Sequence, residues 1–166
     1  PSPRAGLAPK PEPGPRCCVL AKGDLVPDFP VGPTTLHRVL EDRPAVVFFF
    51  PKAFTPGCTA EIRNFRDHQA AIEAKNATLI GVSLDKPDRQ CKFARAENID
   101  FALIGDESRV ISEAYGVIWP VVRRDRRATF LIDEQGMIID VIHHEVQVFR
   151  HLEDVLAQLG LAPATS

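Results

Sequence analysis

Cys58 lies in the segment 51-PKAFTPGC-58, between an apolar run and a stretch with helical periodicity. The nucleophilic form of cysteine is the thiolate, and the N-terminus of a helix stabilises such a charge through its unpaired N–H groups. Pro51 and Pro56 stiffen the loop. The Thr55 hydroxyl can donate to the sulfur or to a bound substrate oxygen. This context favours a reactive thiol over the buried apolar cysteine expected at an arbitrary position.

A thiolate surrounded by hydrogen-bond donors suits displacement at an O–O bond. One oxygen joins the sulfur as a sulfenic acid, and the other leaves with negative charge that a nearby cation would stabilise. The basic cluster 123-RRDRR-127 is a candidate source of that cation. Spacing alone does not say which arginine it is, and a solvated loop is the alternative interpretation.

The elements that must position Cys58 alternate between strands and helices. Buried strands are predicted at 45–50 and 77–84, a short strand at 101–106, and a hairpin at 128–133 and 137–142. Helices are predicted after Cys58, from an N-cap at Asp85, from a cap at Asp106, and over 148–159. The pattern predicts an α/β protein with a thioredoxin-like fold, in which a central mixed β-sheet is flanked by helices on both faces.

The composition is that of one globular domain. The chain has 166 residues and is 45% hydrophobic and 25% charged, with a net charge of −2. That charge does not indicate nucleic acid as a partner, and no apolar run reaches the length of a membrane helix. We expect a flexible, Pro-rich arm at 1–22, the domain at 23–160 and a short tail at 161–166.

The four cysteines are too few for a disulfide scaffold, and the sequence contains no CxxC pair and no zinc-ligand spacing. We therefore expect no metal and no organic cofactor. Reactive thiols suit a reducing compartment, so we expect a cytoplasmic location, with an organelle after processing left open. We expect a monomer or a homodimer.

The segment 51-PKAFTPGC-58 resembles the P-x-x-x-T-x-x-C motif of the peroxiredoxins. Further similarity lies in 23-GDLVPDF-29, 78-TLIGVSLDKP-87, 113-EAYGV-117 and 127-RATFLID-133. The resemblance covers about residues 23–160 in order. It is strongest to the branch of the bacterioferritin comigratory protein and peroxiredoxin Q.

The resemblance implies a role for each matching residue. Cys58 corresponds to the peroxidatic cysteine, Thr55 would hydrogen-bond the peroxide, and Pro51 would shield the sulfur from water. Arg127 would hold the thiolate and polarise the peroxide, and Glu61 would help to orient it. Arg123, Arg124 and Arg126 keep the solvated-loop interpretation.

The resolving thiol is where the sequence departs from the pattern of the peroxiredoxins that it resembles. Many members of the branch have a resolving cysteine five residues after the peroxidatic one, and Arg63 stands there. Cys91, in the helix after Pro87, is the candidate, although it lies about one turn before the position that relatives use. The alternative is a buried, structural Cys91 with resolution by an external thiol. Cys17 and Cys18, in the arm, are a further source of a thiol.

The sequence thus predicts a thiol-dependent peroxidase for hydrogen peroxide and organic hydroperoxides, with a sulfenic acid intermediate at Cys58. Cys91 or an external thiol would resolve it, and a thioredoxin- or glutaredoxin-type protein would restore the thiol. The alternatives are a disulfide oxidoreductase, disfavoured by the missing CxxC, and a redox sensor of the same fold without peroxidase turnover.

Overall fold

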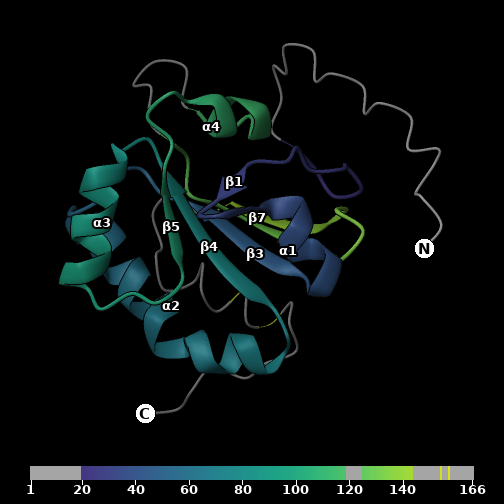
Figure 1. Ribbon diagram of the computed structural model, residues 1–166, viewed down its shortest axis with the longest axis horizontal. Helices are drawn as coiled ribbons and strands as arrows, with labels where there is room; N and C mark the ends of the chain where they lie inside the picture. The colour runs from purple at the N-terminus through teal and green to yellow at the C-terminus, as the bar shows by residue number, and fades with distance from the viewer. Residues whose placement is uncertain (1–19, 119–124, 144–153, 155–156, 158–166) are drawn as a thin grey trace.

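The computed structural model describes residues 20–118, 125–143, 154 and 157 (Figure 1). The elements, in chain order, are β1 (Pro30–Val31), β2 (Thr34–Thr35), α1 (Leu36–Asp42), β3 (Ala45–Phe49), α2 (Pro56–Ala74), β4 (Thr78–Ser83), α3 (Pro87–Ala96), β5 (Ala102–Gly105), α4 (Val110–Tyr115), β6 (Ala128–Ile132) and β7 (Ile138–His143). The predicted strands and the helices they alternate with are confirmed in order. The helix predicted over 148–159 lies almost wholly outside the described residues.

In the described part of the chain, five strands form the central sheet in the order β5-β4-β3-β6-β7. β3 is parallel to β4, and β4 is parallel to β5, whereas β6 is antiparallel to both β3 and β7. The last residue of β3, Phe49, pairs with the first residue of β6, Ala128. The loop that leaves β3 and the residue that precedes β6 therefore meet at one edge of the sheet.

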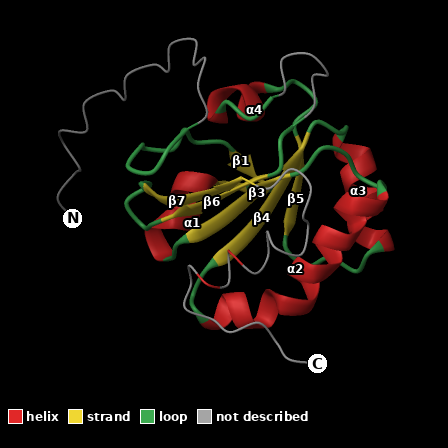
Figure 2. Ribbon diagram, turned by 180° about the vertical axis from the view of Figure 1, so that it is seen from behind, coloured by secondary structure: helices red, strands yellow, loops and turns green. Residues whose placement is uncertain are grey.

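Helices cover both faces of this sheet, as predicted. α2 and α3 lie on one side and α1 on the other in both views (Figures 1 and 2). β3 supplies both cores, because alternate residues of a strand face opposite sides. Val47 and Phe49 pack with the residues of α1 and α4, whereas Val46 and Phe48 pack with those of α2 and α3.

The side of the sheet under α2 is rich in aromatic contacts. Phe48 stacks on Phe65 with ring centroids 4.3 Å apart, and both side chains are fully buried. Ile62 and Ile72 complete the apolar face of α2 that the sequence predicts. Burying such a side chain contributes roughly 1.5–3 kcal/mol, so this face fixes α2, and with it Cys58, against the sheet.

The two predicted N-cap residues do not occupy the N-cap positions. Lys86, not Asp85, is the N-cap of α3. The Asp85 carboxylate instead accepts hydrogen bonds from the Ala53 N–H at 2.8 Å and the Ser83 hydroxyl at 2.6 Å. Arg109, not Asp106, is the N-cap residue of α4, although the two carboxylate oxygens of Asp106 accept from the first-turn N–H groups of Ile111 and Ser112.

The described chain enters the domain before residue 23. Leu20, which we assign to the arm from the sequence, is buried, and its N–H donates to the Tyr115 carbonyl at 3.1 Å. Residues 1–19 and 161–166 lie outside the described part. Within that part, none of the helices has the length and apolar character required to cross a bilayer.

Candidate active site

Cys58 occupies the first turn of α2, as predicted. Thr55 is the N-cap in extended conformation, Pro56 and Gly57 follow, and Cys58 is the third helical residue. Pro56 suits this start because it lacks the N–H that the first turn leaves unpaired. The Cys58 side chain is fully buried, so the sulfur lies in a dry environment at the positive end of a helix dipole.

Arg127 meets this sulfur from the start of β6. Its Nη2 lies 3.2 Å from Cys58 Sγ, and its Nη1 donates to Glu61 Oε2. Cys58 and Glu61 belong to α2, whereas Arg127 directly precedes β6. Arg127 is 66 positions from Glu61 and 69 positions from Cys58 in the chain. The pairing of Phe49 with Ala128 brings them together. One guanidinium thus binds both the sulfur and a carboxylate, which a planar fork of donors allows.

Burial affects the pKa values of both Glu61 and Arg127. Burial raises the pKa of Glu61 from 4.5 to about 7, against the lowering effect of Arg127. For Arg127, burial disfavours the cation, but Glu61 and Cys58 outweigh it and raise the guanidinium pKa above its ordinary value. Arg127 is therefore a permanent cation beside the sulfur.

Thr55 and Pro51 flank the same turn and are half-buried. The Thr55 hydroxyl donates to the Lys52 carbonyl at 2.8 Å. A hydroxyl has one proton, so in this state Thr55 does not donate to Cys58, and its oxygen is left to accept a hydrogen bond. Pro51 follows Phe50, whose N–H donates to the Val82 carbonyl at 3.0 Å.

Cys91 lies on α3 and is exposed, and both Cys58 and Cys91 are free thiols. The interpretation of Cys91 as a buried structural residue is therefore wrong. Cys91 lies two residues from Phe93, about 200° around the helix, and Phe93 is buried in the core that contains Cys58. Cys91 thus faces away from Cys58. Cys17 and Cys18 lie outside the described residues.

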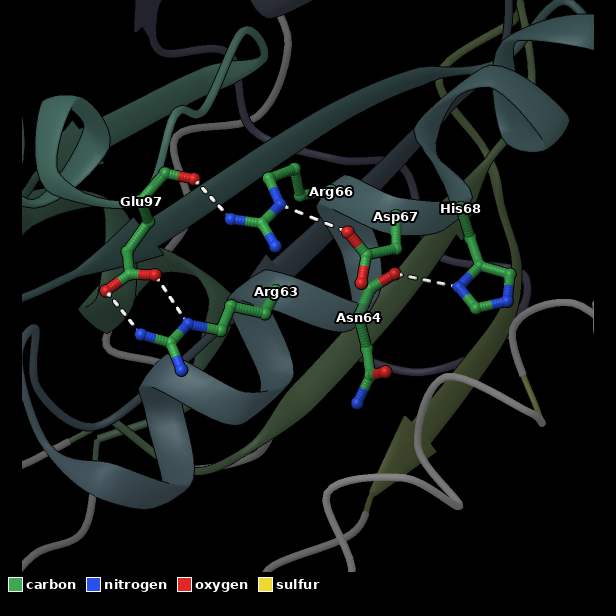
Figure 3. A network of polar contacts seen from close by, with 6 residues as sticks. All are labelled: Arg63, Asn64, Arg66, Asp67, His68 and Glu97. Atoms are coloured by element: carbon green, nitrogen blue, oxygen red, sulfur yellow. Dashed lines mark hydrogen bonds and ion pairs between the residues drawn. The ribbon is translucent and has the colours of Figure 1, made fainter. Parts of the chain in front are cut away.

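Arg63, five residues after Cys58, is part of a bridge between helices. Its guanidinium donates to both carboxylate oxygens of Glu97, at 2.6 and 3.3 Å, and Arg66 Nη1 donates to the Glu97 carbonyl at 2.8 Å. Figure 3 shows both arginines of α2 directed at the residue that ends α3. The bridge holds these two helices together on the surface.

The segment before Arg127 is anchored by buried polar groups. The backbone of Asp125 forms an isolated antiparallel β-bridge with Ile118, and its Oδ2 accepts a hydrogen bond from the Ser112 hydroxyl at 3.1 Å. Burial raises the pKa of Asp125 to about 8. Arg126 is half-buried, and its backbone N–H donates to the Val117 carbonyl at 2.7 Å, so the prediction of a solvated loop is wrong for this residue. Arg123 and Arg124 are outside the described residues.

Two residues near the site were missed from the sequence. Asp85 and Arg89 bind the two backbone polar groups of Ala53, in the loop that leads to Cys58. The only signal in the sequence is an acidic residue just after a strand and a basic residue four positions later. This pattern fits a helix cap and a helical ion pair equally well.

Comparison with known proteins agrees with this geometry. The AhpC/TSA family matches residues 23–141. Peroxiredoxin Bcp of Escherichia coli K12 is 31% identical over 144 residues, which cover 76% of this chain and 92% of that protein. The crystal structure of peroxidoxin BcpB from Mycobacterium tuberculosis has a TM-score of 0.78 at 33% identity, covering 85% of this chain and 97% of that chain.

A third relative links the fold to a reaction. The bacterioferritin comigratory protein of Xanthomonas campestris was solved in work on its alkyl peroxide reduction activity. It has a TM-score of 0.69 at 28% identity and covers 74% of this chain and 82% of that chain. These likenesses confirm the predicted thioredoxin-like fold. The chain belongs to the AhpC/TSA family and is a peroxiredoxin related to the Bcp and peroxiredoxin Q proteins.

Proposed function

We propose that this chain is a thiol-dependent peroxidase that reduces hydrogen peroxide and organic hydroperoxides, with Cys58 as the attacking residue. The observation that carries the proposal is the contact of 3.2 Å between Arg127 Nη2 and the buried Cys58 Sγ at the start of α2. Family membership and the alkyl peroxide reduction activity named for the Xanthomonas relative support the same reaction.

In the first step the Cys58 thiolate attacks one oxygen of the peroxide, and the O–O bond breaks. The sulfur keeps that oxygen as a sulfenic acid, and the other leaves as an alkoxide or hydroxide that takes up a proton. The Arg127 cation stabilises the charge that develops on the leaving oxygen. Glu61 holds the guanidinium on its other side. Because the Thr55 hydroxyl donates its hydrogen bond to the Lys52 carbonyl, Thr55 Oγ would accept a hydrogen bond from the O–H of the peroxide.

A second thiol then condenses with the sulfenic acid, releasing water and forming a disulfide. We propose two routes. In one, Cys91 is the second thiol, and its exposure makes it accessible. Because it faces away from Cys58, this route requires α3 or the start of α2 to unwind locally. In the other, an external thiol resolves Cys58. A thioredoxin- or glutaredoxin-type reductant would reduce either disulfide.

Mass spectrometry after treatment with one equivalent of peroxide tests the proposal. Peptide mapping should locate the modification at Cys58. In intact protein, the Cys91 route predicts loss of two hydrogens in the wild type and an added oxygen in Cys91→Ala. An added oxygen in both proteins would assign resolution to an external thiol. Oxidation at Cys91 while Cys58 stays reduced would refute the proposed role of Cys58.

We also propose a single catalytic domain over 23–160, supported by the family match to 23–141. Residues 1–22 and 161–166 would be an arm and a tail, although Leu20 is buried against the domain. Because a reactive thiol such as Cys58 suits a reducing compartment, we propose a cytoplasmic location, with an organelle after processing as the alternative.

A further inference from the structure

The loop between β3 and α2 is held by side chains from another part of the chain. The Ala53 N–H donates to Asp85 Oδ2 at 2.8 Å, and the Ala53 carbonyl accepts from Arg89 Nη2 at 3.2 Å. Ala53 is fully buried. Both backbone polar groups of Ala53 are therefore satisfied, one by Arg89 in the first turn of α3 and the other by Asp85, two residues before this helix.

These two side chains also fix each other. Arg89 Nε lies 3.1 Å from Asp85 Oδ1, and the Ser83 hydroxyl donates to Asp85 Oδ2 at 2.6 Å. The Asp85 side chain is only 5% exposed, whereas that of Arg89 is 45% exposed. A buried carboxylate with three partners has little freedom to move. We call Asp85 and Arg89 the loop clamp.

The clamp holds an unfavourable backbone conformation. Phe54, which follows Ala53, has φ of 65°, in the left-handed region that non-glycine residues rarely adopt. Its ring packs 5.0 Å from the ring of Phe93 and lies 5.0 Å from the Arg89 guanidinium. The next residue is Thr55, the N-cap of the helix that contains Cys58. Release of the clamp would let this turn relax and would displace the start of α2.

We propose that Asp85 and Arg89 are positioning residues that set the balance between two states of the peroxidatic loop. In the closed state Cys58 is buried beside Arg127 and attacks peroxide. A resolving thiol must instead reach the Cys58 sulfur, which is fully buried in that state, so resolution requires an open loop. The clamp stabilises the closed state. The proposal rests on the peroxidase function, because the two states serve its two steps.

The placement of the clamp couples it to resolution. Arg89 and Cys91 lie within one turn of α3. If Cys91 resolves Cys58, the turn that carries Cys91 must move, and Arg89 then leaves Ala53. If an external thiol resolves it, the loop must open while α3 stays in place, and the clamp breaks at Ala53 alone.

Two rates measured in one turnover test the proposal. The variants are Arg89→Leu and Asp85→Asn, each made with Cys91→Ser so that a small external thiol is the resolving agent. We expect oxidation of Cys58 to slow about tenfold and the reaction of its sulfenic acid with the thiol to accelerate about tenfold. Arg38→Leu, which removes an exposed arginine paired with Glu41 on α1, is the matched control and should change neither rate.

Opposite changes in the two rates distinguish positioning from a merely structural role, which would slow both steps or change neither. Rates that move in the same direction, or that match those of Arg38→Leu, would overturn the proposal. If Asp85→Asn does not fold, Arg89→Leu still decides the question, because its side chain is close to half exposed.

Alkylation of reduced Cys58 by iodoacetamide, located by peptide mapping, tests the clamp without peroxide. We expect both clamp variants to react about tenfold faster than wild type at Cys58, with faster hydrogen exchange at 52–58 and unchanged exchange in β3. Unchanged alkylation in an active peroxidase would refute the clamp and leave the function standing. Faster alkylation in a protein that does not consume peroxide would support the clamp and refute the function.

Discussion

At the scale of single residues, the site depends on one guanidinium that serves two partners. Arg127 lies 3.2 Å from the Cys58 sulfur and also binds Glu61. A cation fixed in a buried site needs no reorganisation when charge moves from sulfur to the leaving oxygen. We therefore propose that Glu61 helps to place Arg127 while the sulfur and the peroxide react.

Replacing Arg127 tests its part in the first step. Arg127→Leu removes the donor and the charge, and we expect the rate constant for Cys58 oxidation by hydrogen peroxide to fall about 100- to 1,000-fold. Arg127→Lys keeps the charge without the planar fork of donors, so its rate constant should lie between those of wild type and Arg127→Leu. Stopped-flow oxidation of the reduced proteins gives these constants. A leucine variant within about threefold of wild type would contradict the assigned role.

The burial of Glu61 predicts a pH-dependent stability. Its pKa in the fold is raised from 4.5 to about 7, so between these values the unfolded chain has lost a proton that the folded protein keeps. The stability of wild type relative to Glu61→Gln should therefore fall as pH rises from about 4.5 to about 7, by roughly 1–3 kcal/mol, and level off above. Urea unfolding of both proteins across this range measures the difference. A difference that is constant or grows with pH would contradict a Glu61 pKa that burial raises.

At the scale of elements, the site forms where three segments meet. Cys58 belongs to α2, Arg127 precedes β6, and Asp85 follows β4. The antiparallel pairing of β3 with β6 and the parallel pairing of β3 with β4 bring these ends to one edge. Hydrophobic periodicity predicts each strand but not which strands are neighbours, since that depends on contacts between distant residues.

Gly105, at the end of β5, tests the packing that supports this edge. A Cβ there would lie 2.6 Å from the Asp85 carbonyl oxygen and 2.7 Å from the Pro87 nitrogen. Because backbone atoms cannot step aside as a flexible side chain can, Gly105→Ala should lower the free energy of unfolding by about 1–3 kcal/mol. Urea denaturation measures it, with the exposed Ser108→Ala as control. An alanine variant as stable as wild type would contradict this, and would show that the backbone before α3 shifts to accommodate the added methyl group.

At the scale of the whole molecule, the sequence predicts the sheet, the two helical layers and the position of Cys58. Local signals are sufficient there, because each strand and the motif around Cys58 lie within a few residues of sequence. The contact of Arg127 with Cys58 came only from family resemblance, since the residues are 69 positions apart. Asp85 was misassigned as a helix cap because the donor that binds it, Ala53, is 32 positions away. Long-range polar contacts of this kind leave no periodic signal in a single sequence.

The central claim is that peroxide turnover depends on the Cys58 thiol, and reductant-dependent peroxide consumption by Cys58→Ser tests it most directly. Wild type should consume hydrogen peroxide in the presence of a thiol reductant, and Cys91→Ser should still consume it when the reductant can resolve Cys58. Cys58→Ser should reduce consumption to the level of buffer and reductant alone. Full turnover by folded Cys58→Ser would contradict the account.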